Sequence, residues 1–116
     1  MIGQLLPKFI DDSRLGDAAL VATIRQMARD TGVEAFVRQE TAILGRRDAR
    51  PDLAGITCPT LVVCGDRDTL LPPYLSEEIA AGIAGARLAM IEGSGHLTTL
   101  EKPEAVNKVL LEFLGL

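Results

Sequence analysis

The sequence has few of the residues that bind metals or form disulfide frameworks. It contains one histidine, His96, and two cysteines, Cys58 and Cys64. Zinc sites are built mainly from several Cys and His ligands, so we expect no metal site of this kind. The two cysteines flank one predicted strand, in which a rise of roughly 3.3 Å per residue places their α-carbons about 20 Å apart. That separation excludes a disulfide between them, and a reducing, cytoplasmic setting fits best.

The chain also lacks long apolar runs and a surplus of basic residues. No apolar run approaches the roughly 20 residues that cross a bilayer, and the first residues show no basic-then-apolar signal pattern. With 12 basic and 16 acidic side chains among 116 residues, the formal charge is −4. This balance argues against a nucleic-acid partner, and Asp48 interrupts the densest basic cluster, Arg46, Arg47 and Arg50. We therefore expect one domain, or part of one, with no membrane and no nucleic-acid partner.

Cofactor motifs are missing too. No glycine-rich loop runs from a strand into a helix with the dinucleotide or P-loop spacing. Asp66 and Asp68 begin like a calcium loop, but Leu70 and Leu71 occupy positions that should carry oxygen ligands and glycine. The sequence therefore predicts no cofactor.

The first fifty residues are predicted to be mainly helical. The first helix has an apolar stripe between a capping aspartate and a terminating glycine, namely Leu20, Ile24 and Met27 between Asp17 and Gly32. Thr31 and Glu34 have the spacing of a capping box, which predicts the start of a second helix. The apolar face of that helix comprises Val33, Phe36, Val37 and Leu44.

The sequence after residue 50 predicts an α/β unit. A polar stretch over residues 46–55, read as a linker or a single helical turn, leads to a continuous apolar run at residues 60–64. Such runs are typical of strands buried on both faces of a parallel sheet. A helix from Pro73 with Leu75, Ile79 and Ile83 in register, a strand at residues 88–91 and a helix from Pro103 follow. A strand–helix–strand crossover of this length predicts parallel strands with a right-handed connection.

An aspartate and the histidine follow these two strands. Because parallel strands end at the same edge of the sheet, we expect the loops that carry Asp68 and His96 to lie side by side. A histidine base needs a carboxylate on its second ring nitrogen, which makes the pair a candidate for catalysis. Other interpretations stay open: a loop histidine is often only solvent-exposed, and Asp66 or Asp68 could cap a turn. Ser94 is a poor candidate nucleophile because it precedes no predicted helix.

The order of these motifs resembles the α/β-hydrolase superfamily. The resemblance rests on residues 56–68 with Pro72 and Pro73, on Gly93-Ser94-Gly95-His96-Leu97 and on residues 100–104, and it covers about residues 46–116. It implies a partial α/β-hydrolase fold, with residues 1–50 as the end of a lid domain and residues 51–116 as a strand–helix–strand–helix part of the core. Within the superfamily the chain looks most like esterases, enol-lactone hydrolases and related C–C bond hydrolases. The resemblance implies that Asp68 is the catalytic acid and His96 the general base.

The nucleophile of this superfamily is not evident in the chain. It sits in a Gly-x-Ser-x-Gly elbow that precedes the acid. None of the three serines, Ser13, Ser76 and Ser94, stands in that motif. We therefore expect the chain to be the C-terminal portion of a larger hydrolase of esters, lactones or related bonds, catalytically incomplete alone. Relatives that use Asp or Cys leave the chemical identity of the nucleophile open.

A two-stranded parallel sheet leaves a strand edge without a partner. We expect that edge to be covered by the missing N-terminal part of a hydrolase or, in the chain alone, by a second copy in a two-fold homodimer. The alternative function is a catalytically inactive hydrolase remnant that acts as an oligomeric or interaction module.

Overall fold

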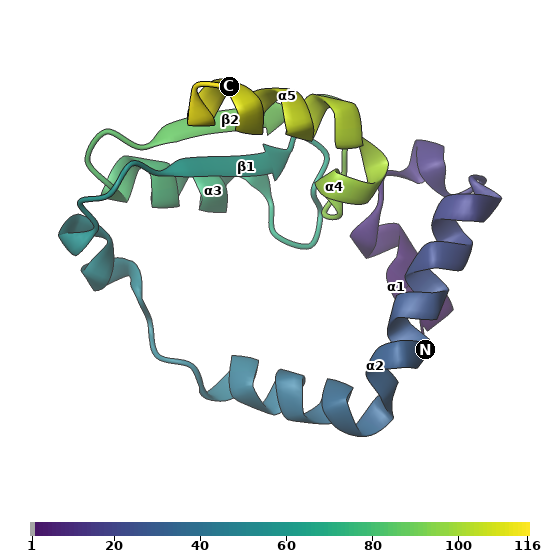
Figure 1. Ribbon diagram of the computed structural model, residues 1–116. Helices are drawn as coiled ribbons and strands as arrows, with labels where there is room; N and C mark the ends of the chain where they lie inside the picture. Colours follow the sequence, from purple (N-terminus) through teal and green to yellow (C-terminus); the bar gives the residue numbers. More distant parts are fainter. Residues whose placement is uncertain (1) are drawn as a thin grey trace.

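The computed structural model describes residues 2–116 and shows helices around a small parallel sheet (Figure 1). The α-helices are α1 (Ile2–Phe9), α2 (Ala18–Gly45), α3 (Pro73–Gly82), α4 (Thr98–Glu101) and α5 (Pro103–Leu114). Two 3₁₀ turns, η1 (Asp12–Arg14) and η2 (Arg50–Gly55), lie between them, and the strands are β1 (Leu61–Gly65) and β2 (Arg87–Ile91). The α/β class is therefore confirmed. Among the described residues no helix is long and apolar enough to span a membrane.

The two strands pair in parallel, as the crossover predicted. Their register runs from Leu61 opposite Arg87 to Gly65 opposite Ile91. Helices α3 and α5 lie on opposite sides of this pair (Figure 1). Because both strands run the same way, the loops after Gly65 and Ile91 leave from one end of the sheet.

Proline and glycine set the ends of the crossover helix. Pro73 occupies the first turn of α3, where a missing backbone donor costs little. The helix ends at Gly82, one residue before Ile83, which was predicted to continue its apolar stripe. Ile83 instead has extended backbone and is 4 % exposed, so it packs as a buried residue of the turn. Gly85 then takes a φ of 73°, a left-handed conformation that favours glycine, and the chain enters β2.

Helix α2 begins and breaks where its sequence indicated. Asp17 caps it by accepting a hydrogen bond from the Leu20 amide at 3.0 Å. The pKa of Asp17 is lowered mainly by a hydrogen bond from the Arg14 side chain and next by the bond from the Leu20 amide. The cap therefore stays ionised. Gly32 breaks the helix with a φ of 76° and a ψ of 162°. The capping box predicted at Thr31 is not formed, because the Thr31 hydroxyl donates backwards to the Met27 carbonyl.

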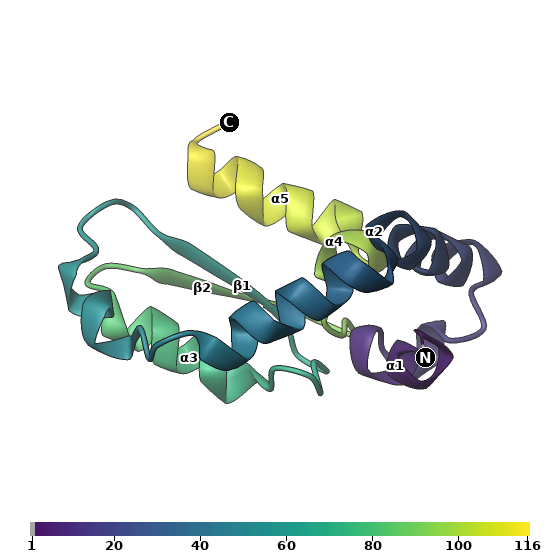
Figure 2. The ribbon, with the colours of Figure 1, turned by 90° about the horizontal axis from the view of Figure 1, so that it is seen from below.

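The two halves of α2 differ in what they pack against. Four buried side chains form a core between α1 and the first half: Leu6, Ile10, Leu20 and Ile24. Leu97 and Leu100, from the other end of the chain, pack on that core. The second half runs below the sheet and stands away from it (Figures 1 and 2). Its predicted apolar face is therefore largely uncovered in this chain, with Val33 70 % and Leu44 87 % exposed.

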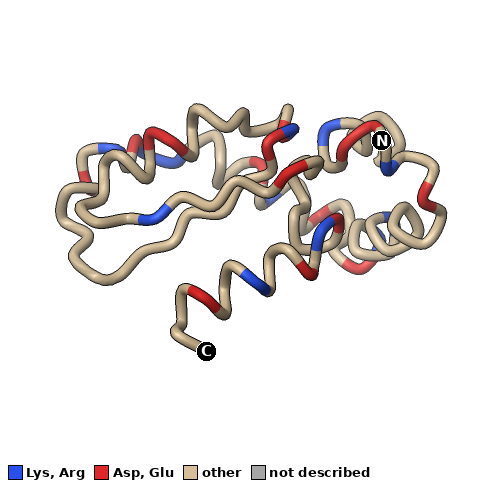
Figure 3. The backbone as a smooth tube through the Cα atoms, turned by 90° about the horizontal axis from the view of Figure 1, so that it is seen from above, with Lys and Arg blue, Asp and Glu red and all other residues tan. Residues whose placement is uncertain are grey.

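Charged residues are distributed over the whole molecule rather than gathered by sign (Figure 3). The basic cluster after α2 is exposed, and two of its arginines pair with nearby carboxylates. Arg50 contacts Asp48 at 2.7 Å and Glu78 at 3.5 Å, and Arg47 contacts Asp52 at 2.6 Å. Hydrogen bonds from the Arg50 side chain lower the pKa of Asp48 to about 2. This segment is a solvated, charge-paired turn.

Candidate active site

The loops after β1 and β2 bring the two predicted site residues into contact. Nδ1 of His96 lies 2.9 Å from Oδ2 of Asp68. The Asp68 side chain is 7 % exposed and that of His96 is 29 % exposed. A carboxylate shielded from water thus faces one ring nitrogen, while part of the ring stays accessible.

The carboxylate of Asp68 is fixed by the backbone of its own loop. Its other oxygen, Oδ1, accepts hydrogen bonds from the amides of Leu70 and Leu71, each at 2.9 Å. These bonds satisfy the ionised form and leave Oδ2 to accept from Nδ1 of His96. A proton assigned to Nδ1 on this basis leaves Nε2 as the basic nitrogen of the neutral ring. Asp68 therefore closes a turn, as the alternative interpretation suggested, and also orients the histidine.

The two loops meet backbone to backbone. The Arg67 amide donates to the Ser94 carbonyl at 3.0 Å, and the Gly93 amide donates to Oδ1 of Asp66 at 2.8 Å. A Cβ atom on Gly65 would lie 2.2 Å from the carbonyl oxygens of both Ser94 and Gly95. Glycine at the end of β1 is therefore what allows the histidine loop to approach the aspartate loop. Asp66 has the turn-stabilising role predicted for it, but across the two loops.

A buried carboxylate beside the pair was missed by the sequence analysis. Glu101, at the end of α4, is 3 % exposed and accepts hydrogen bonds from the amides of Asp11 and Gly95. Asp11 also accepts from Ser13 and contacts Arg67 of the aspartate loop at 3.2 Å. The bond from the Ser13 side chain is the main cause of a lowered pKa at Asp11. The signal available was the Glu-x-Pro motif at Glu101, which sequence reasoning used only as the start of a helix.

No serine of the described residues is placed as the nucleophile. Ser94 is fully buried, and its hydroxyl faces Glu101 at 3.5 Å. Ser13 is hydrogen-bonded to Asp11, and Ser76 lies within α3. Within residues 2–116 the His96 ring has one hydrogen bond, the one to Asp68. The carboxylate–imidazole pair thus has no serine hydrogen-bonded to the ring among residues 2–116.

An apolar cavity of about 340 Å³ lies beside the histidine loop, between α1 and the break in α2. Leu97, the residue after His96, forms part of its wall together with Phe9 and Phe36. Its lining is mainly aliphatic and aromatic, the usual character of a small-molecule site.

Comparison with known proteins decides the family. A sequence model of the Alpha/beta hydrolase family matches residues 3–109, which is most of the chain. The chain belongs to the alpha/beta hydrolase family. The resemblance inferred from its motifs is thereby confirmed, and the match extends upstream of the stretch from which it was inferred.

The relatives of this chain include hydrolases with different activities. A 2-hydroxy-6-oxononadienedioate/2-hydroxy-6-oxononatrienedioate hydrolase of Escherichia coli is 34% identical over 107 residues, covering 90% of this chain and 37% of the relative. The enol-lactonase from Burkholderia xenovorans superimposes with a TM-score of 0.88 at 30% identity, covering 98% of this chain and 44% of the other. A thermophilic esterase from Thermogutta terrifontis gives a TM-score of 0.91 at 28% identity, covering 97% and 42%. The chain thus spans less than half the length of each of these relatives.

Proposed function

We propose that Asp68 and His96 are the acid and the general base of an enzyme that hydrolyses carboxylic esters, lactones or related acyl bonds. The observation that carries the proposal is the 2.9 Å contact between Nδ1 of His96 and Oδ2 of Asp68 at the carboxyl end of two parallel strands. Family membership and the hydrolase relatives support the reaction type. The intact pair, with its carboxylate buried and its ring partly accessible, also favours an enzymatic role over a remnant that has only an interaction function.

In this mechanism His96 moves protons and Asp68 stabilises the charge that results. Nε2 of His96 takes the proton from the nucleophile as the nucleophile attacks the acyl carbon. The proton then passes to the leaving group, and His96 activates the water that releases the acid product. Asp68 stays ionised, holds Nδ1 protonated and stabilises the imidazolium in between. The nucleophile and the oxyanion donors come from a part of the enzyme other than the residues of this chain.

The apolar cavity that Leu97 of the histidine loop helps to line supports a substrate with an apolar part. Its wall runs from Leu97 into α1 and both halves of α2, which were predicted to belong to a lid. We propose that residues 1–50 act as this lid and residues 51–116 as the catalytic core portion. An apolar acyl or alcohol group would then bind over the histidine loop, where burial of apolar surface favours it.

A chimera tests the proposed function. Replacing the aligned segment of the Burkholderia xenovorans enol-lactonase with this chain supplies the missing part of the fold. We expect the chimera to hydrolyse a p-nitrophenyl ester or the lactone, and the His96→Ala variant to lose that turnover. The chain alone is expected to show none. A folded, active chimera that is indifferent to His96→Ala, or turnover by the chain alone, would contradict the proposal.

The unpaired edge of β1 is proposed as the place where the missing part joins. In the chain alone we propose that a second copy covers this edge, giving a homodimer. The β1 residues Leu61, Val62 and Val63 are only partly buried, although they form an apolar strand. Sedimentation velocity at micromolar concentration is expected to give a dimer, and a well-folded monomer would contradict self-association.

A further inference from the structure

Glu101 is a buried ionisable group that the proposed mechanism does not use. Its side chain is 3 % exposed at the end of α4, five residues after His96. Burying a carboxylate is costly unless hydrogen bonds replace its water. The hydrogen bonds that the Glu101 carboxylate accepts therefore show which parts of the chain it holds in place.

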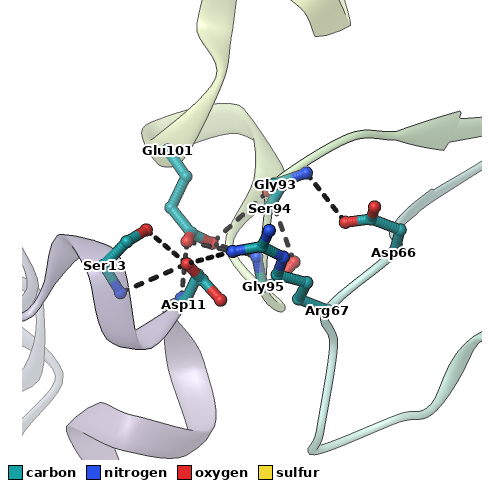
Figure 4. Close-up of polar contacts among 8 residues, drawn as sticks. All are labelled: Asp11, Ser13, Asp66, Arg67, Gly93, Ser94, Gly95 and Glu101. Atoms are coloured by element: carbon teal, nitrogen blue, oxygen red, sulfur yellow. Dashed lines mark hydrogen bonds and ion pairs between the residues drawn. The ribbon is translucent and has the colours of Figure 1, made fainter.

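Two backbone amides converge on this carboxylate (Figure 4). Oε1 of Glu101 accepts from the Asp11 amide at 2.7 Å and from the Gly95 amide at 3.1 Å. Oε2 lies 3.0 Å from the same Gly95 amide and 3.5 Å from the Ser94 hydroxyl. Among residues 2–116, no Lys or Arg side chain forms an ion pair with this carboxylate. The Arg14 guanidinium donates to the backbone carbonyl of Glu101. An acceptor-only group thus accepts from two backbone amides that lie far apart in the sequence and also faces the Ser94 hydroxyl.

The amide of Gly95 belongs to the residue immediately before His96. Its neighbourhood is tight, because a Cβ atom on Gly95 would lie 2.7 Å from the Asp11 nitrogen. The loop therefore presses against the segment after α1, and Glu101 bridges the two amides at that contact. Leu97, on the other side of His96, donates its amide to the Phe9 carbonyl at 2.9 Å. Both neighbours of the histidine are thus anchored to the same segment.

The same segment also reaches the aspartate loop. The Asp11 carboxylate contacts the Arg67 guanidinium at 3.2 Å, next to Asp68 in sequence. The Arg67 amide in turn donates to the Ser94 carbonyl at 3.0 Å. Glu101, Asp11 and Arg67 therefore form a closed set of contacts around the loop that presents His96 to Asp68 (Figure 4).

We propose that Glu101 is a positioning residue that sets the place of His96 relative to Asp68 in the proposed catalytic pair. It touches neither the imidazole nor a reacting atom in the contacts of the described residues. It acts by holding the Gly95 peptide, and it requires a carboxylate because both of its oxygens face hydrogen-bond donors. In Glu101→Gln, one oxygen becomes an NH₂ group that faces donors, so only part of this geometry is retained. In Glu101→Ala, both amides lose their acceptor inside the protein.

The sole histidine of the chain provides a direct readout. In the ¹⁵N-labelled chain, the Nδ1 proton shared with Asp68 is expected to give a slowly exchanging, downfield signal. We expect Glu101→Ala to lose this signal and Glu101→Gln to weaken it and speed its exchange. Glu104→Gln, which neutralises an exposed carboxylate in α5, should leave the signal unchanged. Val106→Ala removes buried apolar volume from α5 and separates general destabilisation from loss of positioning.

Several results would overturn the positioning role. One is an unchanged Nδ1 signal in Glu101→Gln or Glu101→Ala. Another is equal loss of that signal in Val106→Ala at the same reduction in stability. Should both Glu101 variants fail to fold, amide exchange in the parent chain decides the question. There the Asp11 and Gly95 amides must be strongly protected, and exchange at the rate of open amides overturns the proposal.

Turnover of the enol-lactonase chimera separates this proposal from the proposed function. We expect Glu101→Gln to lower kcat and kcat/KM together by about 10- to 100-fold, the scale of a small misplacement of a catalytic group. Glu104→Gln should leave both unchanged. If turnover requires His96 but is unaffected by Glu101→Gln, the positioning role fails and the function stands. If the Nδ1 signal depends on Glu101 but the turnover is unchanged in His96→Ala, the proposed function fails and the positioning role of Glu101 stands.

Discussion

Replacing Asp68 with asparagine is expected to lower kcat of the enol-lactonase chimera by about 10⁴-fold, the loss seen when a triad aspartate becomes an amide. An asparagine offers Nδ1 of His96 either an NH₂ group or a neutral oxygen. The proton is then no longer held on Nδ1, and the imidazolium loses its counter-charge. The fold should persist, since the amide oxygen can still accept from the Leu70 and Leu71 amides that now bond Oδ1.

Asp66 supplies the matched control for this substitution. It lies two residues earlier in the same loop, and its Oδ1 accepts one bond, from the Gly93 amide. An asparagine at position 66 can keep that bond, so Asp66→Asn should change kcat only a few-fold. Steady-state kinetics of the two variants, with circular dichroism to check folding, make the comparison. Equal losses, or a larger loss at position 66, would move the acid role away from Asp68.

Replacing Gly65 with alanine is expected to give the largest loss of stability of any single methyl group added to this chain. The new Cβ would lie 2.2 Å from two backbone oxygens, those of Ser94 and Gly95. Backbone atoms cannot rotate away as a side chain does, so the loops must separate or β1 must shift. We expect a reduction of at least about 3 kcal/mol in the free energy of unfolding, at the upper end of overpacking effects.

Urea unfolding followed by circular dichroism measures this reduction. Gly55→Ala is the control, because a Cβ at that glycine has no atom within 4 Å and its φ is not positive. The unfolding midpoint of Gly55→Ala should stay near that of the parent, while that of Gly65→Ala falls sharply. Similar midpoints for the two variants would mean that the loops after β1 and β2 do not approach as closely as described.

The parallel unit could be predicted because its signals are local. A continuous apolar run with a proline before it indicates a buried strand, and Pro73 and Pro103 fix the starts of two helices. That the loops of Asp68 and His96 lie side by side followed from topology, since parallel strands end at one edge, whereas the choice of Asp68 over Asp66 came from the family resemblance. The parallel pairing and the meeting of the two loops needed only the order of elements along the chain.

Long-range contacts were beyond the same reasoning. Nothing in the pattern around Asp11 indicates that its amide meets Glu101, because the donor is a backbone group that every residue except proline carries. The sequence predicted the apolar face of the second half of α2, but it did not predict which surface that face contacts. Hydrophobic periodicity shows which residues of a helix favour burial. It does not show whether another part of the chain covers them. Val33 and Leu44 find no such surface here.

The bond between the Asp11 amide and Glu101 joins residues that are 90 positions apart in the sequence. This bond thus closes a large loop of the chain around the site, and residues 18–60 form nearly half of that loop. The entropy of closing a loop grows with the logarithm of its length, so doubling the loop costs only about 0.6 kcal/mol. Insertions in α2 or in the segment after it can therefore reshape the cavity wall at little cost to the Asp68–His96 pair. Such an enzyme can change its substrate range while its acid and base keep their positions.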